Sequence, residues 1–343
     1  MAADLGRRNE SGMALVLTLL LISFLVAVTM QLMVTADRQV TEATAQREQV
    51  RLDAMVLAGL NLARAALLAD QEENNFDSMQ DLWATFAPEA LKALAGDLDL
   101  RITVTDLSGR LQVNALGAKG PGKNPGGSAQ QGSQDQQKIH AIWLRLLTSG
   151  KFAIEDEEQA EALLDAIGDW IDQDGNERDQ GAEEPYYRSL KPPYASRNKA
   201  VTQIGELLLI KGMKQEILYG DKEHEALANY ITVAGEDGKI NLNSAPSLVL
   251  QALSADMTPQ LAQDLIDFRE DKRNTEALGS VSWYKQVGGF PEGVSFDSSL
   301  LTVAGTHFSI RVQATHNQFI RTGTGMLKRQ ENKGQEILLW QIQ

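Results

Sequence analysis

The chain of 343 residues contains no cysteine and only four histidines. The missing cysteines exclude disulfides and thiolate metal sites. None of the histidines has a ligand-spaced partner such as H-E-x-x-H, and no G-x-S-x-G nucleophile motif occurs. The sequence therefore predicts no catalytic residues and no enzymatic activity. A membrane-anchored, calcium-dependent hydrolase would need a base and a nucleophile that these motifs do not supply.

Basic residues are also fewer than acidic residues. There are 32 Lys and Arg against 46 Asp and Glu, which gives a formal net charge of −14. Because phosphate binding needs a basic surface, this balance argues against nucleic acid as a principal partner. Aromatic residues make up only 6% of the chain, whereas glycines number 28. This composition favours helices joined by loops over a large all-β core.

One long uncharged segment stands near the N-terminus. Residues 12–36, GMALVLTLLLISFLVAVTMQLMVTA, carry no charge, and about 20 apolar residues suffice to cross a bilayer as a helix. Arg7 and Arg8 precede the segment and Asp37 follows it. The positive-inside rule therefore predicts a single span, with the short N-terminus in the cytoplasm and the bulk of the chain on the other side.

Three kinds of targeting segment could account for this span. A secretory signal peptide fits poorly, because the apolar run is too long and no small-x-small cleavage site closes it. A plain signal anchor fits better. A short basic leader that ends in Gly12 and is followed by Met13 and an apolar run resembles the signal of prepilins and pseudopilins. That resemblance implies a leader of residues 1–12 and cleavage between Gly12 and Met13.

The helical pattern does not end with the membrane segment. Apolar residues recur at helical spacing as far as Leu68, and no proline interrupts them. This predicts one helix from about Met13 to Leu68, about 80 Å long at about 1.5 Å per residue. Residues 13–36 would lie in the membrane and residues 37–70 outside it. Such a helix is typical of pilin-like subunits, whereas a coiled-coil stalk would need sustained heptads.

The rest of the chain alternates between strand-like and helix-like segments. Two stretches, Asp97 to Leu116 and Tyr230 to Pro246, have apolar alternation around a glycine-containing turn and predict β-hairpins. The last residues alternate again and should return to the first sheet. We expect a pilin-like α/β region at 71–117, a flexible Gly/Gln/Ser linker at 118–137, an α-helical lobe at 138–229, a hairpin plus a two-helix lobe at 230–300, and sheet strands at 301–343.

The two-helix segment from Ser244 to Arg269 resembles a helix-hairpin-helix module, which in DNA-binding proteins grips phosphate through a glycine-rich turn. Here the turn reads SADMT, without glycine and with Asp256 where a phosphate would lie. Packing is therefore a better interpretation than DNA binding. A membrane-anchored DNA-uptake protein that uses this module stays as an alternative of a different class.

Several stretches together are similar to one family. The sequences DWIDQDGNERDQGAEEPYY, PPYASRN, ELLLIKGM and INLNSAP, in this order after a prepilin-like N-terminus, resemble the K-type minor pseudopilins of type II secretion systems. The resemblance covers most of the chain. It implies an α+β fold, in which a long N-terminal helix packs on a small antiparallel sheet that a large helical insertion interrupts.

The resemblance also implies a role. K-type subunits are thought to initiate or cap a pseudopilus at its tip, with other minor pseudopilins and the inner-membrane assembly platform as partners. A prepilin peptidase would cleave after Gly12 and methylate Met13, and the bulk of the chain would lie in the periplasm of a bacterium, anchored in the inner membrane. The equivalent tip subunit of a type IV pilus is a rival that gene neighbourhood would distinguish.

One departure from the usual pilin pattern supports the K-type assignment. Most pilins have Glu at the fifth mature position, where it pairs with the N-terminal amine of the preceding subunit. Counting from Met13, this chain has Leu17. An unpaired carboxylate is costly in a bilayer, and a tip subunit has no predecessor to pair with. We expect the assembly face of the membrane helix to comprise Leu17, Leu20, Phe24 and Val28.

The acidic loop that follows a predicted helix is a candidate calcium site. Asp172, Asp174, Asn176 and Glu183 match positions 1, 3, 5 and 12 of an EF-hand loop, although Gly175 stands one place too early. Pro185 argues against an exiting helix. Calcium binding in this lobe is known for K-type relatives, which implies ligand roles for Asp172, Asp174 and Glu183, and for Asn176 and Asp179. A solvated acidic loop and an acid/base site are the alternatives.

Overall fold

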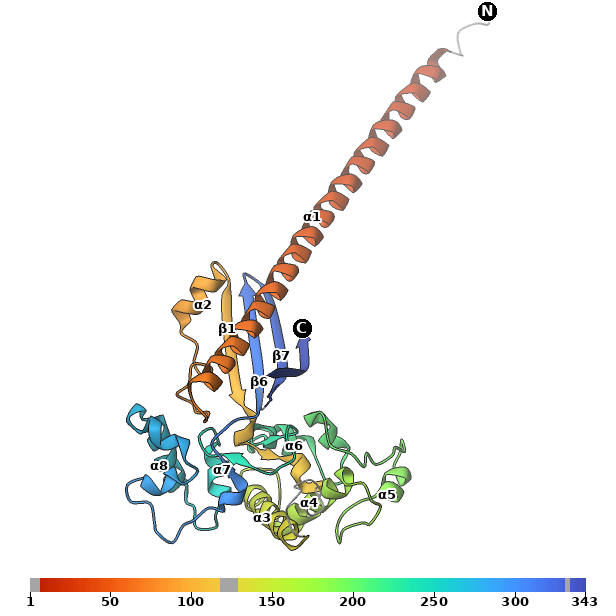
Figure 1. Ribbon diagram of the computed structural model, residues 1–343. Coiled ribbons are helices and arrows are strands. Elements are labelled where there is room, and N and C mark those ends of the chain that lie inside the picture. Colours follow the sequence, from red (N-terminus) through yellow and green to blue (C-terminus); the bar gives the residue numbers. More distant parts are fainter. Residues whose placement is uncertain (1–6, 118–128, 331–333) are drawn as a thin grey trace, which may run out of the picture.

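The computed structural model describes residues 7–117, 129–330 and 334–343. Figure 1 shows a long helix that projects from a small sheet, with a helical lobe at the opposite end of that sheet. The α-helices are α1 (Arg7–Glu73), α2 (Pro88–Ala95), α3 (Ala129–Leu147), α4 (Glu157–Ile171), α5 (Glu184–Ser189), α6 (Gln215–Tyr219), α7 (Ser247–Ala252) and α8 (Pro259–Glu270). The strands are β1 (Asp99–Asp106), β2 (Leu111–Gln112), β3 (Ile231–Thr232), β4 (Ile240–Asn241), β5 (Leu301–Thr302), β6 (His307–His316), β7 (Phe319–Arg329) and β8 (Gln335–Ile342).

The main sheet has the order β1-β6-β7-β8, and all its neighbours are antiparallel. The C-terminal half of α1 packs on one face of this sheet (Figure 1). The core between helix and sheet contains Leu52, Val56, Leu60, Ala63, Leu67, Leu100, Val104, Phe308, Ile310, Val312 and Leu327. The predicted α+β, pilin-like fold is confirmed, as is the return of the C-terminal strands to the sheet that β1 begins.

Helix α1 contains the predicted helix and extends beyond both of its ends. Its N-terminal part makes no core. Every residue from Gly12 to Ala43 is exposed, and the segment is long and apolar enough to cross a membrane. The hydroxyls of Thr18, Ser23 and Thr29 bond to carbonyls three or four residues earlier, so these polar side chains are satisfied within the helix.

Neither predicted hairpin forms. After β1 the chain turns through a 3-10 helix, Leu107–Gly109, and β2 leaves the main sheet to pair in parallel with β3. The reason is Asp106, whose buried carboxylate accepts hydrogen bonds from Ser108 N at 2.8 Å and from Ser244 Oγ at 2.6 Å. These bonds hold the turn against the lobe, and β1 pairs instead with the ten-residue strand β6.

The second predicted hairpin does not form, because its turn encloses the side chain of Gln112. Gln112 donates to Asp237 Oδ1 at 2.8 Å and accepts from Gly238 N at 3.1 Å, so it occupies the space between β3 and β4. Gly238, with φ +69°, has the left-handed conformation that this wrapping needs. Strand β4 therefore pairs in parallel with β5 rather than with β3.

The helical lobe has a continuous hydrophobic core. Residues of the two segments that the sequence separates, 138–229 and 230–300, contribute to it together, because α3 packs against α7. The predicted linker also needs correction. Its residues 118–128 lie outside the described residues, as do residues 1–6 of the predicted leader, but residues 129–137 belong to α3. The helical lobe therefore begins before residue 138.

Candidate cation site, buried carboxylates and membrane helix

The predicted calcium loop connects two helices. Asp172 is the C-terminal cap of α4 and Glu183 is the N-terminal cap of α5. The expectation that Pro185 prevents an exiting helix is wrong, because Pro185 lies in the first turn of α5, where its missing N–H is not needed. The loop thus has an entering and an exiting helix, and its first and last candidate ligands are fixed by them.

Asp169, which spacing did not single out, organises the loop. Its side chain is fully buried, and its Oδ2 accepts from the backbone amides of Arg178 at 3.2 Å and Ala182 at 2.9 Å. A side chain at Gly181 would collide with the same oxygen. Burial raises the pKa of Asp169, and these bonds to Arg178 and Ala182 partly offset the rise. Asp169 therefore stabilises the loop and is not available as an outward-facing ligand.

Glu183 is the least satisfied acid of the loop. It is 3% exposed, and neither oxygen of its carboxylate has a hydrogen-bond partner in the described part of the chain. Burial raises its pKa, and the negative charges of Asp169 and Asp172 raise it further. The backbone amide of Glu184 lowers the pKa of Glu183 by part of this amount, although its geometry is not that of a hydrogen bond. A buried carboxylate without donors is the kind of ligand that a divalent cation would satisfy.

The remaining candidates divide into two groups. The negative charges of Asp172 and Asp174 both raise the pKa of Glu183. Asn176 is exposed and donates its side-chain amide to Asp174 Oδ1 at 2.8 Å. Asp179 is exposed, and its charge is not among the main influences on Glu183. Of the predicted ligands, Asp172 and Glu183 are therefore buried, whereas Asn176 and Asp179 lie at the surface.

Asn198 is a loop neighbour that spacing could not find. It lies 24 residues after Asp174 and donates its amide to the Asp174 carbonyl at 3.3 Å. Its own side-chain oxygen is buried and accepts no hydrogen bond from the described residues. The backbone there has φ +47°, a left-handed conformation that asparagine tolerates better than most residues. The only sequence signal was its place in the family-like stretch PPYASRN.

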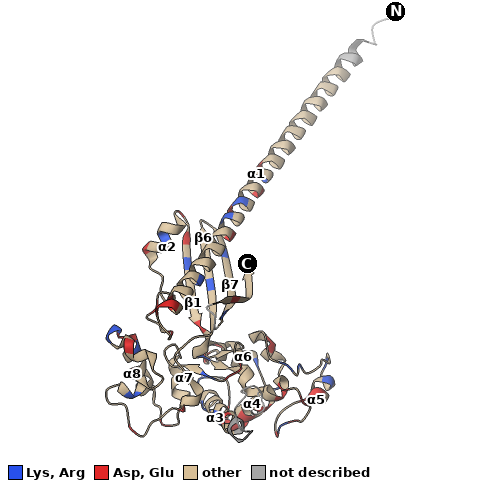
Figure 2. Ribbon diagram, viewed as in Figure 1, with Lys and Arg blue, Asp and Glu red and all other residues tan. Residues whose placement is uncertain are grey.

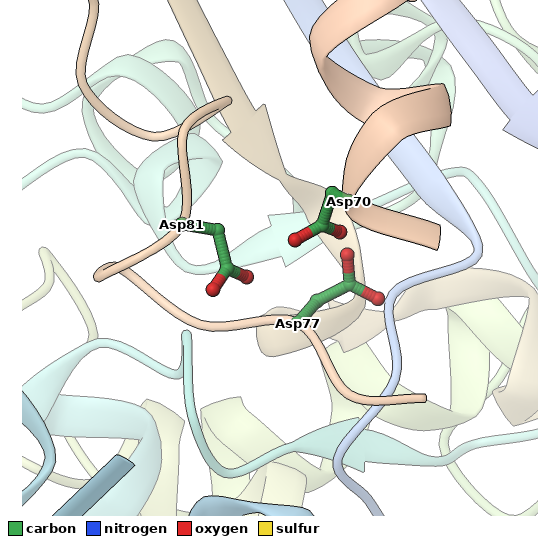
Figure 3. Close-up of side chains that lie close together, drawn as sticks. All are labelled: Asp70, Asp77 and Asp81. Atoms are coloured by element: carbon green, nitrogen blue, oxygen red, sulfur yellow. The ribbon is translucent and has the colours of Figure 1, made fainter. Parts of the chain in front are cut away.

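A second group of acids lies where α1 meets the lobe. Asp70, Asp77 and Asp81 offer oxygens within 4.8 Å of one another, and Figure 3 shows Asp70 and Asp77 facing each other. Arg329 from the end of β7 donates to Asp77 Oδ1 at 2.5 Å and to Asp70 Oδ2 at 2.8 Å. It also donates to the Leu67 carbonyl at 2.7 Å. Its guanidinium supplies the positive charge that a metal would otherwise bring.

Donors satisfy this second group almost completely. Asp81 accepts from Ser78 N at 2.6 Å, Ser78 Oγ at 3.0 Å and Trp83 Nε1 at 3.2 Å, and Gly305 N donates to Asp77 at 2.7 Å. Burial raises the pKa of Asp70 and of Asp81 to about 6 each. The cluster is therefore best understood as a buried network of ion pairs and hydrogen bonds that joins helix, sheet and lobe.

The membrane part of α1 presents its predicted assembly residues to the surroundings. Leu17, Leu20, Phe24 and Val28 are all exposed, at a spacing of three or four residues, which puts them along one face of the helix. Gly12 and Met13 lie within the continuous helix. Figure 2 shows that charged residues on α1 are concentrated in its half near the sheet. The face of the membrane helix that the sequence predicts for assembly is thus accessible.

The two-helix module folds as expected but turns its basic residue inward. Helices α7 and α8 pack together, and Thr258 Oγ1 caps α8 by accepting from Leu261 N at 3.2 Å. Arg269 is 6% exposed and donates to the Leu242 carbonyl at 2.7 Å. Asp256 in the turn is exposed. An acidic turn and an internal arginine favour the packing role over phosphate recognition.

Comparisons with known proteins agree with this geometry. The family model described as type II secretion system (T2SS), protein K, matches residues 109–236. The type II secretion system protein K of Pseudomonas aeruginosa is 26% identical over 77% of this chain and 73% of its own length. The protein of the same name from Klebsiella pneumoniae is 22% identical over 76% of each chain.

A solved structure extends the likeness to the fold. In the GspK-GspI-GspJ complex of enterotoxigenic Escherichia coli, a chain matches with a TM-score of 0.61 and 17% identity, over 88% of this chain and 99% of that one. The likeness spans most of the chain and supports the pilin-like α+β fold. The resemblance to the K-type minor pseudopilins of type II secretion systems is thus confirmed by the family model, by relatives that match most of the chain and by the shared fold.

Proposed function

We propose that this protein is the tip subunit of a type II secretion pseudopilus, where it initiates or caps assembly and performs no catalysis. The observation that carries the proposal is the position of the lobe. It lies beyond the end of the sheet that is remote from the free end of α1 (Figure 1). A subunit stacked above the sheet along the helix axis would collide with this lobe, whereas subunits below would not. Growth beneath the protein is therefore permitted and growth above it is blocked.

The exposed apolar part of α1 supports a single-pass anchor in the inner membrane, with the sheet and the lobe in the periplasm. The solved E. coli relative is in complex with GspI and GspJ, and we extend such partners to this chain. Other minor pseudopilins would pack on the face formed by Leu17, Leu20, Phe24 and Val28. The inner-membrane assembly platform would receive the resulting complex.

The tip position can be tested on pseudopili directly. Antibody-gold labelling of the lobe, on pseudopili elongated by excess major pseudopilin, should mark one end of each fibre. Labelling along the whole length would refute the tip assignment. As an internal comparison, antibody against the major pseudopilin should label the entire fibre.

Processing by a prepilin peptidase is a separate part of the proposal. Peptide mass spectrometry of the membrane-extracted protein should find a mature N-terminus at N-methylated Met13. Gly12→Ala should leave the precursor uncut but inserted in the membrane, while Ser11→Ala, one residue earlier, should be processed normally. A precursor that keeps Met1 in a host with the peptidase would turn the apolar run into a plain anchor.

We further propose that the acidic loop binds calcium through Asp172, Asp174 and Glu183. The unsatisfied oxygens of buried Glu183 fit a hard divalent cation, and the nearby amide oxygen of Asn198 adds a neutral ligand of the preferred type. Asn176 would contribute from the surface, and exposed Asp179 only if the loop rearranged. Bound calcium would relieve the mutual repulsion of these acids and would stabilise the loop between α4 and α5.

The calcium proposal predicts a change in thermal stability. For the full chain in detergent, calcium at 100 times its Kd should add about 2.7 kcal/mol to the free energy of unfolding. The double variant Asp172→Ala and Glu183→Ala should lose this response. Glu177→Ala, an exposed acid in the same loop, should keep it. A double variant that still responds like the wild type would move the site elsewhere.

A further inference from the structure

Arg178 lies inside the acidic loop and bridges two of its buried carboxylates. Its Nη1 is 3.2 Å from Asp169 Oδ1 and its Nη2 is 3.3 Å from Asp172 Oδ2. The Asp169 and Asp172 side chains are 0% and 2% exposed, whereas the Arg178 side chain is 28% exposed. The acids are therefore fixed inside the protein, and the positive charge that pairs with them can reach water.

The end of α4 is shaped to receive this guanidinium. Nη1 also approaches the Asp165 carbonyl at 3.4 Å, and a side chain at Gly168 would overlap the guanidinium directly. A cation here also compensates the partial negative charge at the C-terminal end of the helix. Lys211, another cation near the loop among the described residues, donates to the carbonyls of Gln180 and Gly181 at 3.2 and 2.7 Å, so it binds backbone rather than carboxylate.

Asp169 and Asp172 have different roles beside Arg178. Asp169 has two backbone amides as further donors, so it stays satisfied when the guanidinium moves. Asp172 is the proposed calcium ligand, and its negative charge raises the pKa of Glu183, whose carboxylate has no hydrogen-bond partner among the described residues. A divalent cation between Asp172 and Glu183 would stand close to the guanidinium, and the two positive charges would repel each other.

We infer that Arg178 is a built-in counter-ion that competes with calcium for Asp172. Without calcium it holds the acids of the loop together. When calcium binds, the guanidinium releases Asp172, keeps Asp169 and the end of α4, and turns its freed side toward solvent. Arg178 thereby sets how much calcium is needed to fill the loop. This inference rests on the calcium site proposed above.

The test is the calcium affinity of charge-removed variants, measured by isothermal titration on the full chain in detergent. Arg178→Gln should bind calcium at least about tenfold more tightly than the wild type, because a nearby repelling charge is lost. Its melting temperature without calcium should be lower. The matched control is Arg188→Gln, which removes an equal charge from α5 at a side chain that is 60% exposed and paired with Glu184. The control should bind within about threefold of the wild type.

Each outcome has a distinct meaning. Equal or weaker calcium binding by Arg178→Gln, beside a wild type that binds, would overturn the competition and leave the calcium site intact. An equal gain in the Arg188→Gln control would also overturn it. Absence of binding in every variant would remove the calcium site and the inference together.

If Arg178→Gln unfolds without calcium, recovery of its near-ultraviolet circular dichroism on calcium addition supports the inference, and failure to recover opposes it. Arg178→Lys, which keeps the charge, should retain near wild-type affinity.

Discussion

Replacing Arg329 by methionine should destabilise the protein strongly. The Arg329 side chain is 7% exposed, and its guanidinium is ion-paired with Asp70 and Asp77 and lies 4.7 Å from the centre of the Phe308 ring. Methionine fills part of the volume but leaves two buried acids without their counter-charge. Breaking a buried ion pair on one side typically costs about 3–5 kcal/mol. We expect a loss in this range at pH 7, with the calcium loop unaffected.

The assay is denaturant unfolding of the full chain in detergent, followed by near-ultraviolet circular dichroism. Arg273→Met is the matched control, because Arg273 also pairs with an aspartate but its side chain is 88% exposed. We expect no measurable change for this control, since exposed ion pairs contribute little. If Arg329→Met is no more destabilising than Arg273→Met, the inference that the ion pairs of Arg329 stabilise the junction is wrong.

The pH dependence of the Arg329→Met variant gives a second check. Loss of the guanidinium should raise the pKa of Asp70 further, so the folded variant binds a proton more readily than the folded wild type. The variant should therefore lose more stability than the wild type as pH rises from 5 to 7, and the difference between the two proteins should shrink in acid. A difference that grows in acid would contradict this assignment of charge.

Two further predictions concern the same core. The folded-state pKa values of Asp70 and Asp81, about 6 against an ordinary 3.8, mean that the folded chain holds more protons than the unfolded chain between these pH values. The free energy of unfolding should thus fall as pH rises from about 4 to about 6, by at most about 3 kcal/mol per group, and Asp81→Asn should flatten the fall in a pH series of denaturant melts. Gly323→Ala should destabilise by about 1–3 kcal/mol, because its new methyl would overlap the ring of Trp340, while Gly293→Ala, with open space around it, should change thermal stability by less than about 0.5 kcal/mol.

Local signals were sufficient for the parts of the protein that depend on local interactions. An uncharged run of 25 residues from Gly12 to Ala36 has few structural outcomes other than a membrane-length helix. The alternating strands at the C-terminus likewise have one apolar face, which must meet the apolar face of the long helix. The fold class could therefore be derived before the structure was known.

The two hairpins failed for the opposite reason. Strands of two residues, such as β2 and β3, have too few hydrogen bonds to choose a partner by themselves, and distant contacts decide their pairing. Asp106 reaches Ser244, 138 residues away, and Gln112 reaches Asp237, 125 residues away. Alternation in the sequence cannot reveal such contacts.

The same limit applies to the candidate site. EF-hand-like spacing selects Asp172, Asp174 and Glu183 as candidates, because their positions along one loop are local. It missed Asp169, whose role is to bind loop amides, and Asn198, which arrives from a later segment. No local pattern could predict the ion pairs of Arg329, since its partner Asp70 is 259 residues away.

The two acidic clusters differ in how their charge is neutralised, and this difference separates structure from binding. At the junction, Arg329 and backbone amides supply donors for Asp70 and Asp77, so an added cation would have to displace a buried guanidinium. In the loop, the Arg178 guanidinium is partly exposed and pairs with Asp169 and Asp172, and the Glu183 carboxylate has no hydrogen-bond partner in the described residues. Displacing a partly solvated arginine from one carboxylate costs less than displacing a buried one from two. Cation affinity should therefore reside in the loop, although the junction has the closer set of carboxylates.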